Sequence, residues 1–275
     1  MNPSPIGVFD SGLGGLTVAA QILKKLPNEP IIYLADTAHV PYGERPLEEI
    51  QGFALDITRF LRSLGCKMVV MACNMSSAVA LHPAKEAFTD IPVLGVIEPG
   101  VRAAVRLAGD RPIGVMATTG TVSSHAYSKA IHAASPDIDV YEQACPAFVP
   151  LVESGKQDSP QAYSAAREYA QILLDGNVGT IILGCTHYPF LFPAIAEAAG
   201  PAVTLVDPAE ETVIEIEKTL VENDIQCPEG RASDHRFFCT GDPAGFAELG
   251  SRFLRSRIDR VEQAVWGVDI GKVLA

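Results

Sequence analysis

The sequence predicts an α/β protein with two pseudo-symmetric, doubly wound parallel-sheet domains of the flavodoxin-like type and an active site between them. Short apolar runs bounded by turn residues alternate with longer amphipathic stretches along most of the 275 residues, as is typical of βαβ units. The alternation occurs in two series, and each contains a cysteine directly after an apolar run, Cys73 and Cys185. With 48% hydrophobic and 20% charged residues, the chain can fill one large core or two smaller ones.

The first series predicts a sheet of nearly continuous apolar strands. Such runs indicate strands that are buried on both faces, as in parallel sheets. We expect strands at Ile6–Phe9, Ile31–Ala35, Met68–Ala72 and Val93–Ile97, and helices at about Leu16–Lys25, Leu47–Ser63 and Ser77–Phe88.

The second series repeats the pattern, and a tail follows it. We expect strands at Ile113–Ala117, Val140–Gln143, Thr180–Gly184 and Val203–Val206, and helices at Ser123–Ala134, Gln161–Leu174 and Pro193–Ala199. The tail predicts a helix from Pro208 to about Glu222, a strand at His235–Cys239 and a helix from about Ala244 to Arg255, and it fits either sheet. We therefore predict one domain from residues 1–98 and 208–275 and another from residues 99–207.

Composition narrows the class of protein. The formal net charge of −12 argues against nucleic acid as a main partner, since phosphate binding relies on clustered Lys and Arg. Six cysteines without the density of a secreted disulfide scaffold indicate a reducing compartment. The chain shows neither a signal-peptide pattern nor a membrane-length apolar run, so we expect a cytoplasmic protein. Because no CxxC or HxxxH spacing occurs, we expect no metal site.

Two polar turns follow the first two predicted strands. Asp10 and Ser11 begin a glycine-rich turn whose backbone can approach a ligand, and an acid beside a hydroxyl can orient a base or bind an amine. Thr17 stands where a dinucleotide fingerprint needs glycine, so nucleotide binding is disfavoured. Tyr42 and Gly43 lie in the second turn, which shares its sheet edge with the first. Plain tight turns are the alternative for both.

Cys73 and Cys185 each lie where a buried strand gives way to a turn and a helix. A helix N-terminus lowers the pKa of a thiol from about 8.5 toward neutral. A single cysteine in such a run is usually apolar filler, but two in matched settings favour a shared ligand. Polar groups follow both thiols: Asn74 and Met75 after Cys73, and Thr186 and His187 after Cys185. The remaining cysteines at 66, 145, 227 and 239 lack such settings, and we expect them to be structural.

Several chemistries use two thiols. A disulfide couple usually has CxxC spacing, and a cysteine hydrolase would use Cys185 with His187 and leave Cys73 idle. Racemisation requires two acid/base groups on opposite faces of one carbon, which two thiols from two similar halves supply. No lysine falls at the carboxyl end of a predicted strand, where pyridoxal phosphate would need a Schiff base. We therefore expect no cofactor.

Two further candidates come from the second series. Thr118 and Thr121 lie in a hydroxyl-rich turn before a helix, which fits either an anion site or an N-cap. Glu153 is either a solvated carboxylate or a site residue.

The chain resembles the glutamate racemases of the cofactor-independent aspartate/glutamate racemase superfamily. The resemblance covers most of the chain and is carried by GVFDSGLGGLT at 7–17, DTAHVPYG at 36–43, ACN at 72–74, GVIEPG at 95–100 and LGCTHYP at 183–189. It implies interconversion of L- and D-glutamate, supply of D-glutamate for peptidoglycan, and a homodimer. The alternatives are a racemase for aspartate or a related amino acid, and a regulatory protein of the gyrase-inhibitor type.

The resemblance also implies residue roles. Cys73 would act on the D-isomer with help from Asp10, and Cys185 on the L-isomer with help from His187 and Glu153. Substrate contacts would come from Asp10, Ser11, Tyr42, Gly43, Asn74, Met75, Thr186 and His187. Met75 departs from the family, which usually has Thr there, so a backbone amide or a neighbouring serine would have to replace that hydroxyl.

Overall fold

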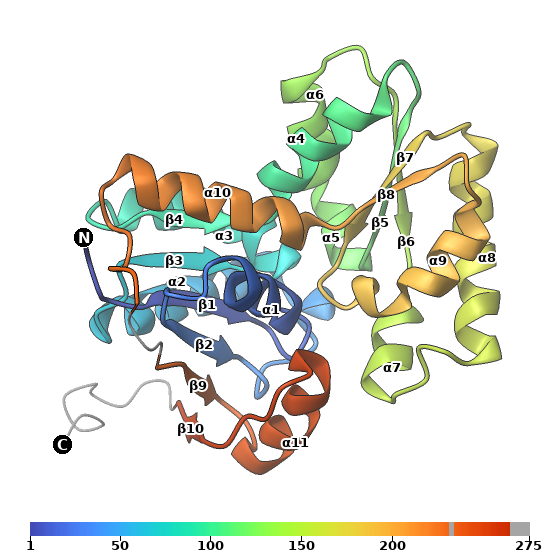
Figure 1. The fold of residues 1–275 in the computed structure, drawn as a ribbon. Helices are drawn as coiled ribbons and strands as arrows, with labels where there is room; N and C mark the ends of the chain where they lie inside the picture. The colour runs from blue at the N-terminus through green and yellow to red at the C-terminus, as the bar shows by residue number, and fades with distance from the viewer. Residues whose placement is uncertain (231–233, 265–275) are drawn as a thin grey trace. The chain divides into compact units, whose positions relative to one another are not determined.

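The structure, a computed structural model, describes residues 1–230 and 234–264. The chain divides into two compact units: one comprises Met1–Gly95 and the chain from Val213 onward, and the other comprises Val96–Thr212. Each unit has its own parallel sheet (Figure 1), so the predicted fold class is confirmed. The domain boundaries predicted after residues 98 and 207 remain a prediction.

The sheet of the first unit has the order β10-β9-β2-β1-β3-β4, and all of its strands are parallel (Figure 1). Its strands are β1 (Ile6–Asp10), β2 (Ile31–Ala35), β3 (Met68–Met71), β4 (Val93–Gly95), β9 (Arg236–Cys239) and β10 (Val261–Gln263). The sequence left open which sheet the tail joins. The tail strand β9 pairs with β2, so the tail extends the first sheet.

Helices cover both faces of this sheet. They are α1 (Leu16–Lys25), α2 (Leu47–Ser63), α3 (Asn74–Ala87), α11 (Pro243–Leu254) and the later part of α10 (Pro208–Glu222), with a short 3-10 helix η1 (Tyr42–Glu44). The helices α2 and α3 pack together, as do α1 and α11. Coverage of both faces is why the strands read as unbroken apolar runs.

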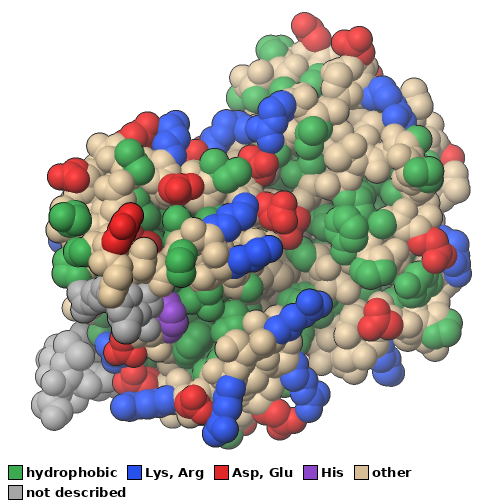
Figure 2. Space-filling model, in the orientation of Figure 1, with side chains coloured by type: hydrophobic (Ala, Val, Ile, Leu, Met, Phe, Trp, Pro, Cys, Tyr) green, Lys and Arg blue, Asp and Glu red, His purple; other side chains and the backbone are tan. Residues whose placement is uncertain are grey.

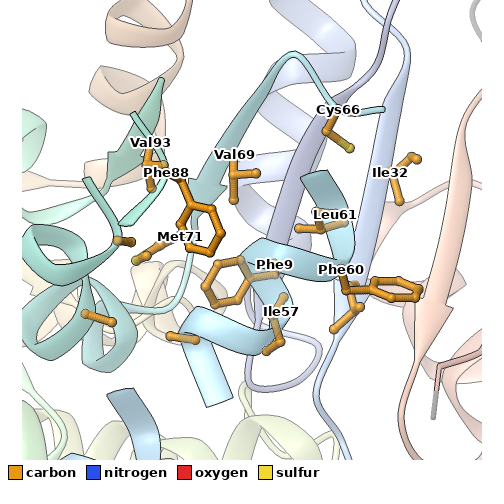
Figure 3. Packing of buried hydrophobic residues seen from close by; sticks show 14 of the residues in the cluster. Phe9, Ile32, Ile57, Phe60, Leu61, Cys66, Val69, Met71, Phe88 and Val93 are labelled. Carbon is orange, nitrogen blue, oxygen red and sulfur yellow. The ribbon is translucent and has the colours of Figure 1, made fainter. Parts of the chain in front are cut away.

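A buried cluster between the sheet and helices α2 and α3 forms the core on one face (Figure 3). Phe9, Val69 and Met71 of the sheet meet Ile57 and Leu61 of α2 there. All five side chains are fully buried. Burying side chains of this size contributes about 1.5–3 kcal/mol each, so the cluster fixes β1 and β3, the two strands that lead into the predicted site.

The second unit has a four-stranded parallel sheet in the order β6-β5-β7-β8. Its strands are β5 (Ile113–Ala117), β6 (Val140–Ala144), β7 (Thr180–Gly184) and β8 (Thr204–Val206). Its helices are α4 (Ile97–Ala108), α5 (Thr119–Ser124), α6 (Ala126–Ala134), α7 (Phe148–Glu153), α8 (Pro160–Asp175), α9 (Phe192–Ala199) and the start of α10, with a short 3-10 helix η2 (Tyr188–Leu191).

The two sheets share one strand order. In each, the first strand is flanked by the second and third strands of its series and the fourth lies outside the third, which is the flavodoxin-like order. Such a sheet has a switch point beside its first strand, and ligands bind outside the carboxyl ends of the strands there. The switch points lie between β1 and β3 and between β5 and β7. Cys185 comes directly after β7, and Cys73 comes two residues after the end of β3.

Two local predictions are wrong. The strand expected to reach Ile97 ends at Gly95, and Ile97 begins α4. Pro99 reads as a breaker in the sequence, yet proline is tolerated in the first turn of a helix. The single helix expected from Ser123 is two helices, because His125 adopts a left-handed conformation with φ of 53°. The helix α4, the helix α7, which carries Glu153, and the strand β10 were not predicted.

The surface shows no concentration of one charge sign on the face drawn in Figure 2, where basic and acidic side chains are interspersed. Among the described residues, no helix has both the length and the apolar run that crossing a bilayer requires.

A buried ion pair ties distant segments of the first unit together. Lys67 Nζ lies 2.6 Å from Glu29 Oε2 and donates to the carbonyl of Asn2 at 2.9 Å. The other oxygen of Glu29 accepts the backbone N–H of Cys227 at 2.7 Å, which fastens the segment after α10. Both charged side chains are buried, so loss of one partner leaves the other uncompensated.

Replacing Lys67 by Met therefore lowers the free energy of unfolding by about 3–5 kcal/mol, because Glu29 is left buried without its cation. Urea unfolding measures the change. Lys218→Met is the control: Lys218 and Glu222 form an exposed pair at 3.8 Å, and its loss costs less than about 0.5 kcal/mol. Equal effects of the two substitutions would contradict this account of the pair.

Candidate active site

In the first unit, Cys73 joins β3 to α3. It is the N-cap residue of α3, with extended backbone angles, and its carbonyl accepts the N–H of Ser77 at 2.9 Å. The Ser77 hydroxyl donates to the carbonyl of Met71 at 2.9 Å, which fixes the turn from strand to helix. Cys73 as a whole residue is 6% exposed. The sequence therefore places a nearly buried sulfur at the amino end of a helix, as predicted.

The first-unit residues predicted for the site gather around this sulfur. Cys73 Sγ lies 3.8 Å from Ser11 Oγ. Tyr42, Met75 and Ile50 belong with Cys73 to one buried apolar cluster. Two others lie next to these in the chain: Asn74, buried, is the first residue of α3, and Gly43, partly exposed, follows Tyr42 in η1. Met75 therefore places apolar surface beside the thiol.

Asp10 ends β1 and is fully buried. Its Oδ2 accepts the N–H of Gly12 at 2.9 Å. A Cβ on Gly15 would lie 2.5 Å from Asp10 Cβ and 3.0 Å from Ala72 Cβ. Glycine is needed there because any side chain would push apart the ends of β1 and β3, so the glycine-rich turn serves to pack the site.

The electrostatics of Cys73 differ from the sequence prediction. Burial first, and then the charge of Asp10, raise the pKa of the Cys73 thiol to about 11, and hydrogen bonds from Ser76 and Ser11 offset only part of the rise. The expectation of a lowered pKa at the helix N-terminus is wrong for this thiol. Cys73 is therefore protonated at neutral pH and is suited to donate a proton.

A polar network that the sequence reasoning missed holds Tyr42. Its hydroxyl donates to Asp36 Oδ2 at 2.5 Å. The other oxygen of Asp36 lies 2.7 Å from His39 Nδ1 and accepts the Thr240 hydroxyl at 2.8 Å. Asp36 is fully buried. The available signal was its position directly after β2, at the same sheet edge as Asp10.

In the second unit, Cys185 follows β7 and is 7% exposed. Its Sγ lies 3.8 Å from His187 Nδ1, and His187 Nε2 lies 3.3 Å from Glu153 Oε1. Thr186 between them is buried. The structure thus brings one ring nitrogen of His187 near Cys185 and the other near the half-exposed carboxylate of Glu153.

The helix α7 places Glu153 through aromatic packing. Phe148 at its start is fully buried and meets Tyr188 edge to face, with ring centroids 5.0 Å apart. Tyr188 follows His187 directly and donates its hydroxyl to the carbonyl of Cys145 at 3.2 Å. The sequence reasoning missed Tyr188, although its place beside the motif was a signal.

Thr118 and Thr121 lie at the start of α5. Thr118 is its N-cap residue: its hydroxyl oxygen accepts the N–H of Thr121 at 3.4 Å and lies 3.0 Å from the Thr121 hydroxyl. This is the N-cap alternative of the sequence analysis. A role of these residues in substrate binding remains a prediction.

The registers of the two sheets reveal a correspondence between the surroundings of Cys73 in the first unit and those of Cys185 in the second, which we call the two half-sites. Phe9 pairs with Met71 in the first sheet, so Ser11 and Cys73 lie two residues past paired positions. Ala117 pairs with Gly184 in the second sheet, and the next residues are Thr118 and Cys185. Each thiol therefore has a hydroxyl residue at the same position on the neighbouring strand.

The half-sites differ in the group that accompanies the thiol: a carboxylate, Asp10, in the first unit and an imidazole, His187, in the second. Within the described part of the chain, no three His, Cys, Asp or Glu side chains are grouped so as to hold a metal ion.

Comparison with known proteins gives consistent results. The sequence profile of the Asp/Glu/Hydantoin racemase family matches residues 7–216. A glutamate racemase from Corynebacterium diphtheriae is 46% identical over 263 residues, which cover 96% of this chain and 98% of that protein.

Solved structures agree with the sequence matches. A glutamate racemase isoform from Bacillus anthracis is similar with a TM-score of 0.93 and 38% identity, over 98% of this chain and 100% of that one. A glutamate racemase from Francisella tularensis, solved in complex with D-glutamate, has a TM-score of 0.91 and 36% identity over the same shares.

The raised pKa of Cys73 makes a specific prediction for Asp10→Asn. Removing the carboxylate charge removes the second cause of the rise, so the pKa falls and more thiolate is present at pH 8. Alkylation of Cys73 by iodoacetamide should accelerate about three- to tenfold, since one pKa unit changes the thiolate fraction tenfold. Peptide mass spectrometry reads the rate at each cysteine. Cys66, whose pKa is raised by burial without a carboxylate, is the internal reference. Unchanged or slower alkylation of Cys73 would refute the assigned cause.

Proposed function

Since the chain belongs to the Asp/Glu/Hydantoin racemase family, we propose that it is an isomerase that interconverts L- and D-glutamate by proton transfer through Cys73 and Cys185. The observation that carries the residue assignment is the correspondence between the two thiols: each lies nearly buried at the switch point of its sheet, and a hydroxyl residue, Ser11 or Thr118, stands at the matching position on the neighbouring strand. The relatives named above are glutamate racemases, which supports glutamate as the substrate.

The proposed reaction balances with two thiols. The thiolate of one cysteine takes the α-proton of glutamate: the C–H bond breaks, an S–H bond forms, and the electron pair stays on the substrate, delocalised into its carboxylate. The thiol of the other cysteine then delivers its own proton to the opposite face, so that its S–H bond breaks and a new C–H bond forms. Substrate and product are enantiomers, and the two sulfurs exchange protonation states.

The local electrostatics suit this exchange. Cys73, with its pKa near 11, is the proton donor when L-glutamate reacts. When D-glutamate reacts, Cys73 must first lose its proton, and buried Asp10 is the base that can accept it. In the second unit His187 is the base that accepts the proton of Cys185, and its Nε2 lies 3.3 Å from Glu153 Oε1.

Substrate contacts are proposed from both half-sites. Hydroxyl and amide groups beside the thiols suit the ammonium and carboxylates of an amino acid. We assign Ser11, Tyr42, Gly43, Asn74 and the backbone of Met75 in the first unit, and Thr186, His187, Thr118 and Thr121 in the second. Met75 carries no side-chain hydroxyl, and its apolar packing against Cys73 leaves contact there to the backbone.

The family resemblance also supports a proposal about cofactor use, biological role and oligomeric state. We propose that the enzyme works without pyridoxal phosphate or another cofactor, supplies D-glutamate for peptidoglycan in the cytoplasm, and acts as a homodimer. Light scattering at micromolar concentration tests the last point, with an expected mass twice the 29.3 kDa of one chain.

The two-thiol assignment is tested by Cys73→Ser and Cys185→Ser. Because a serine hydroxyl is a far weaker acid than a thiol, each variant should lose at least about 10²–10⁴-fold in racemisation. Circular dichroism follows the loss of optical activity of D- and L-glutamate without added pyridoxal phosphate. A parallel assay with D- and L-aspartate tests which amino acid is the substrate.

Cys239→Ser is the matched control, since this buried cysteine lies on β9 and has no proposed role. It should racemise like the unmodified chain. Full activity in Cys73→Ser or Cys185→Ser would overturn the mechanism. Turnover of aspartate in preference to glutamate would overturn the substrate assignment.

A further inference from the structure

Tyr33 lies in the middle of β2 and is fully buried, without a role in the reaction described so far. Its ring stacks on Phe246 of α11, with centroids 6.1 Å apart, and is tilted against Phe237 of β9 at 6.4 Å. Its hydroxyl donates to the carbonyl of Gly12 at 2.8 Å, within the glycine-rich turn. A phenylalanine would make the same ring contacts, so the presence of a hydroxyl indicates a role beyond packing.

We propose that Tyr33 is a positioning residue for proton transfer at Cys73, which it serves by holding Gly12 so that the Gly12 N–H stays directed at the Asp10 carboxylate. The inference rests on the proposed racemase function and adds a residue to its machinery. The chain of contacts is short: the Tyr33 hydroxyl binds the Gly12 carbonyl at 2.8 Å, and the Gly12 N–H donates to Asp10 Oδ2 at 2.9 Å.

The turn needs such an anchor because its backbone is rich in glycine. Glycine has the widest choice of backbone angles, so a glycine turn holds one geometry only where outside contacts fix it. The space around Gly15 shows how closely the parts fit: a Cβ there would lie 2.9 Å from the Tyr33 hydroxyl and 2.5 Å from Asp10 Cβ. Tyr33, Asp10 and the turn thus form one packed group.

The hydroxyl remains a donor under all conditions of catalysis. Burial, and then the negative charges of Asp10 and Cys73, raise the pKa of the Tyr33 phenol well above its usual value. A buried hydroxyl without a partner costs free energy, so Tyr33 keeps its bond to Gly12 while charge moves between Asp10 and Cys73. Small displacements of a proton-transfer group reduce rates strongly.

A double-mutant cycle tests the proposal with Tyr33→Phe, Asp10→Asn and the double variant. Tyr33→Phe keeps the aromatic packing and removes only the hydroxyl. We expect its kcat to fall about tenfold with KM changed less than twofold, since positioning affects the transition state. In the Asp10→Asn background the same substitution should lower kcat less than twofold, because Tyr33 acts through Asp10.

Thr58→Val is the matched control for stability. The Thr58 hydroxyl is also fully buried in the first unit and donates to a backbone carbonyl, that of Ala54 at 2.7 Å, but it lies on α2. Both variants should lower the thermal midpoint by similar amounts, and only Tyr33→Phe should lower kcat. Equal falls in kcat, a tenfold effect of Tyr33→Phe that persists without Asp10, or an active Tyr33→Phe enzyme would each overturn the proposal.

Alkylation of Cys73 separates failure of this inference from failure of the proposed function. If Tyr33 positions the Asp10 charge, Tyr33→Phe changes the alkylation rate of Cys73 at pH 8, and it has no effect once Asp10 is Asn. This readout needs no turnover. An unmodified chain without racemase activity would refute the function, whereas an unchanged alkylation rate in Tyr33→Phe would refute the role of Tyr33.

Discussion

Parallel pairing of the first and third strands of each series determines the position of every group in the candidate site. The carboxyl ends of β1 and β3 meet at one edge, and so do those of β5 and β7. Because both sheets have the same strand order, the residues after these strands become neighbours in both units. The register then gives each thiol a hydroxyl residue at the same position on the neighbouring strand, Ser11 for Cys73 and Thr118 for Cys185. The glycine-rich turn follows from the same constraint, since a side chain at Gly15 would separate the strand ends.

The two half-sites have the same strand order and register, but they differ in the ionisable group that accompanies the thiol. A buried carboxylate accompanies Cys73, and it keeps the thiol protonated together with burial. An imidazole accompanies Cys185 and is itself backed by Glu153. Racemisation, whose substrate and product are mirror images, is therefore proposed to use two chemically different assisting groups, a carboxylate for Cys73 and an imidazole for Cys185. Each partner is held by the fold: Asp10 by the Gly12 amide, and Glu153 by the packing of α7 on Tyr188.

Local patterns were sufficient to predict every strand except β10, together with both cysteines. The runs that contain β3 and β7 are apolar because helices cover both faces of each sheet, and the matched positions of Cys73 and Cys185 after these runs indicated the two thiols. The helix α4 was missed because its apolar residues are interrupted by Pro99 and Gly100. Gly100 is there because a Cβ would lie 2.9 Å from Pro208, a contact that no local pattern reveals.

Site features that depend on long-range contacts could not be predicted. The hydrogen bonds of Asp36 include one from Thr240, which is distant in sequence and follows directly after the tail strand β9 beside β2. The pKa of Cys73 depends on burial and on the charge of Asp10, which exceed the helix-terminus effect that the sequence suggested. In the sequence, Tyr33 is part of an apolar run, and its hydrogen bond to the carbonyl of Gly12 becomes evident only in the folded structure.

The central claim is that Cys73 and Cys185 act on one carbon from opposite faces. A crystal structure of the chain with D-glutamate bound tests it most directly. The account predicts both sulfurs within about 3–4 Å of the α-carbon, the near-attack range, and on opposite sides of it. A bound glutamate that contacts only one thiol, or both thiols on the same face, would contradict it.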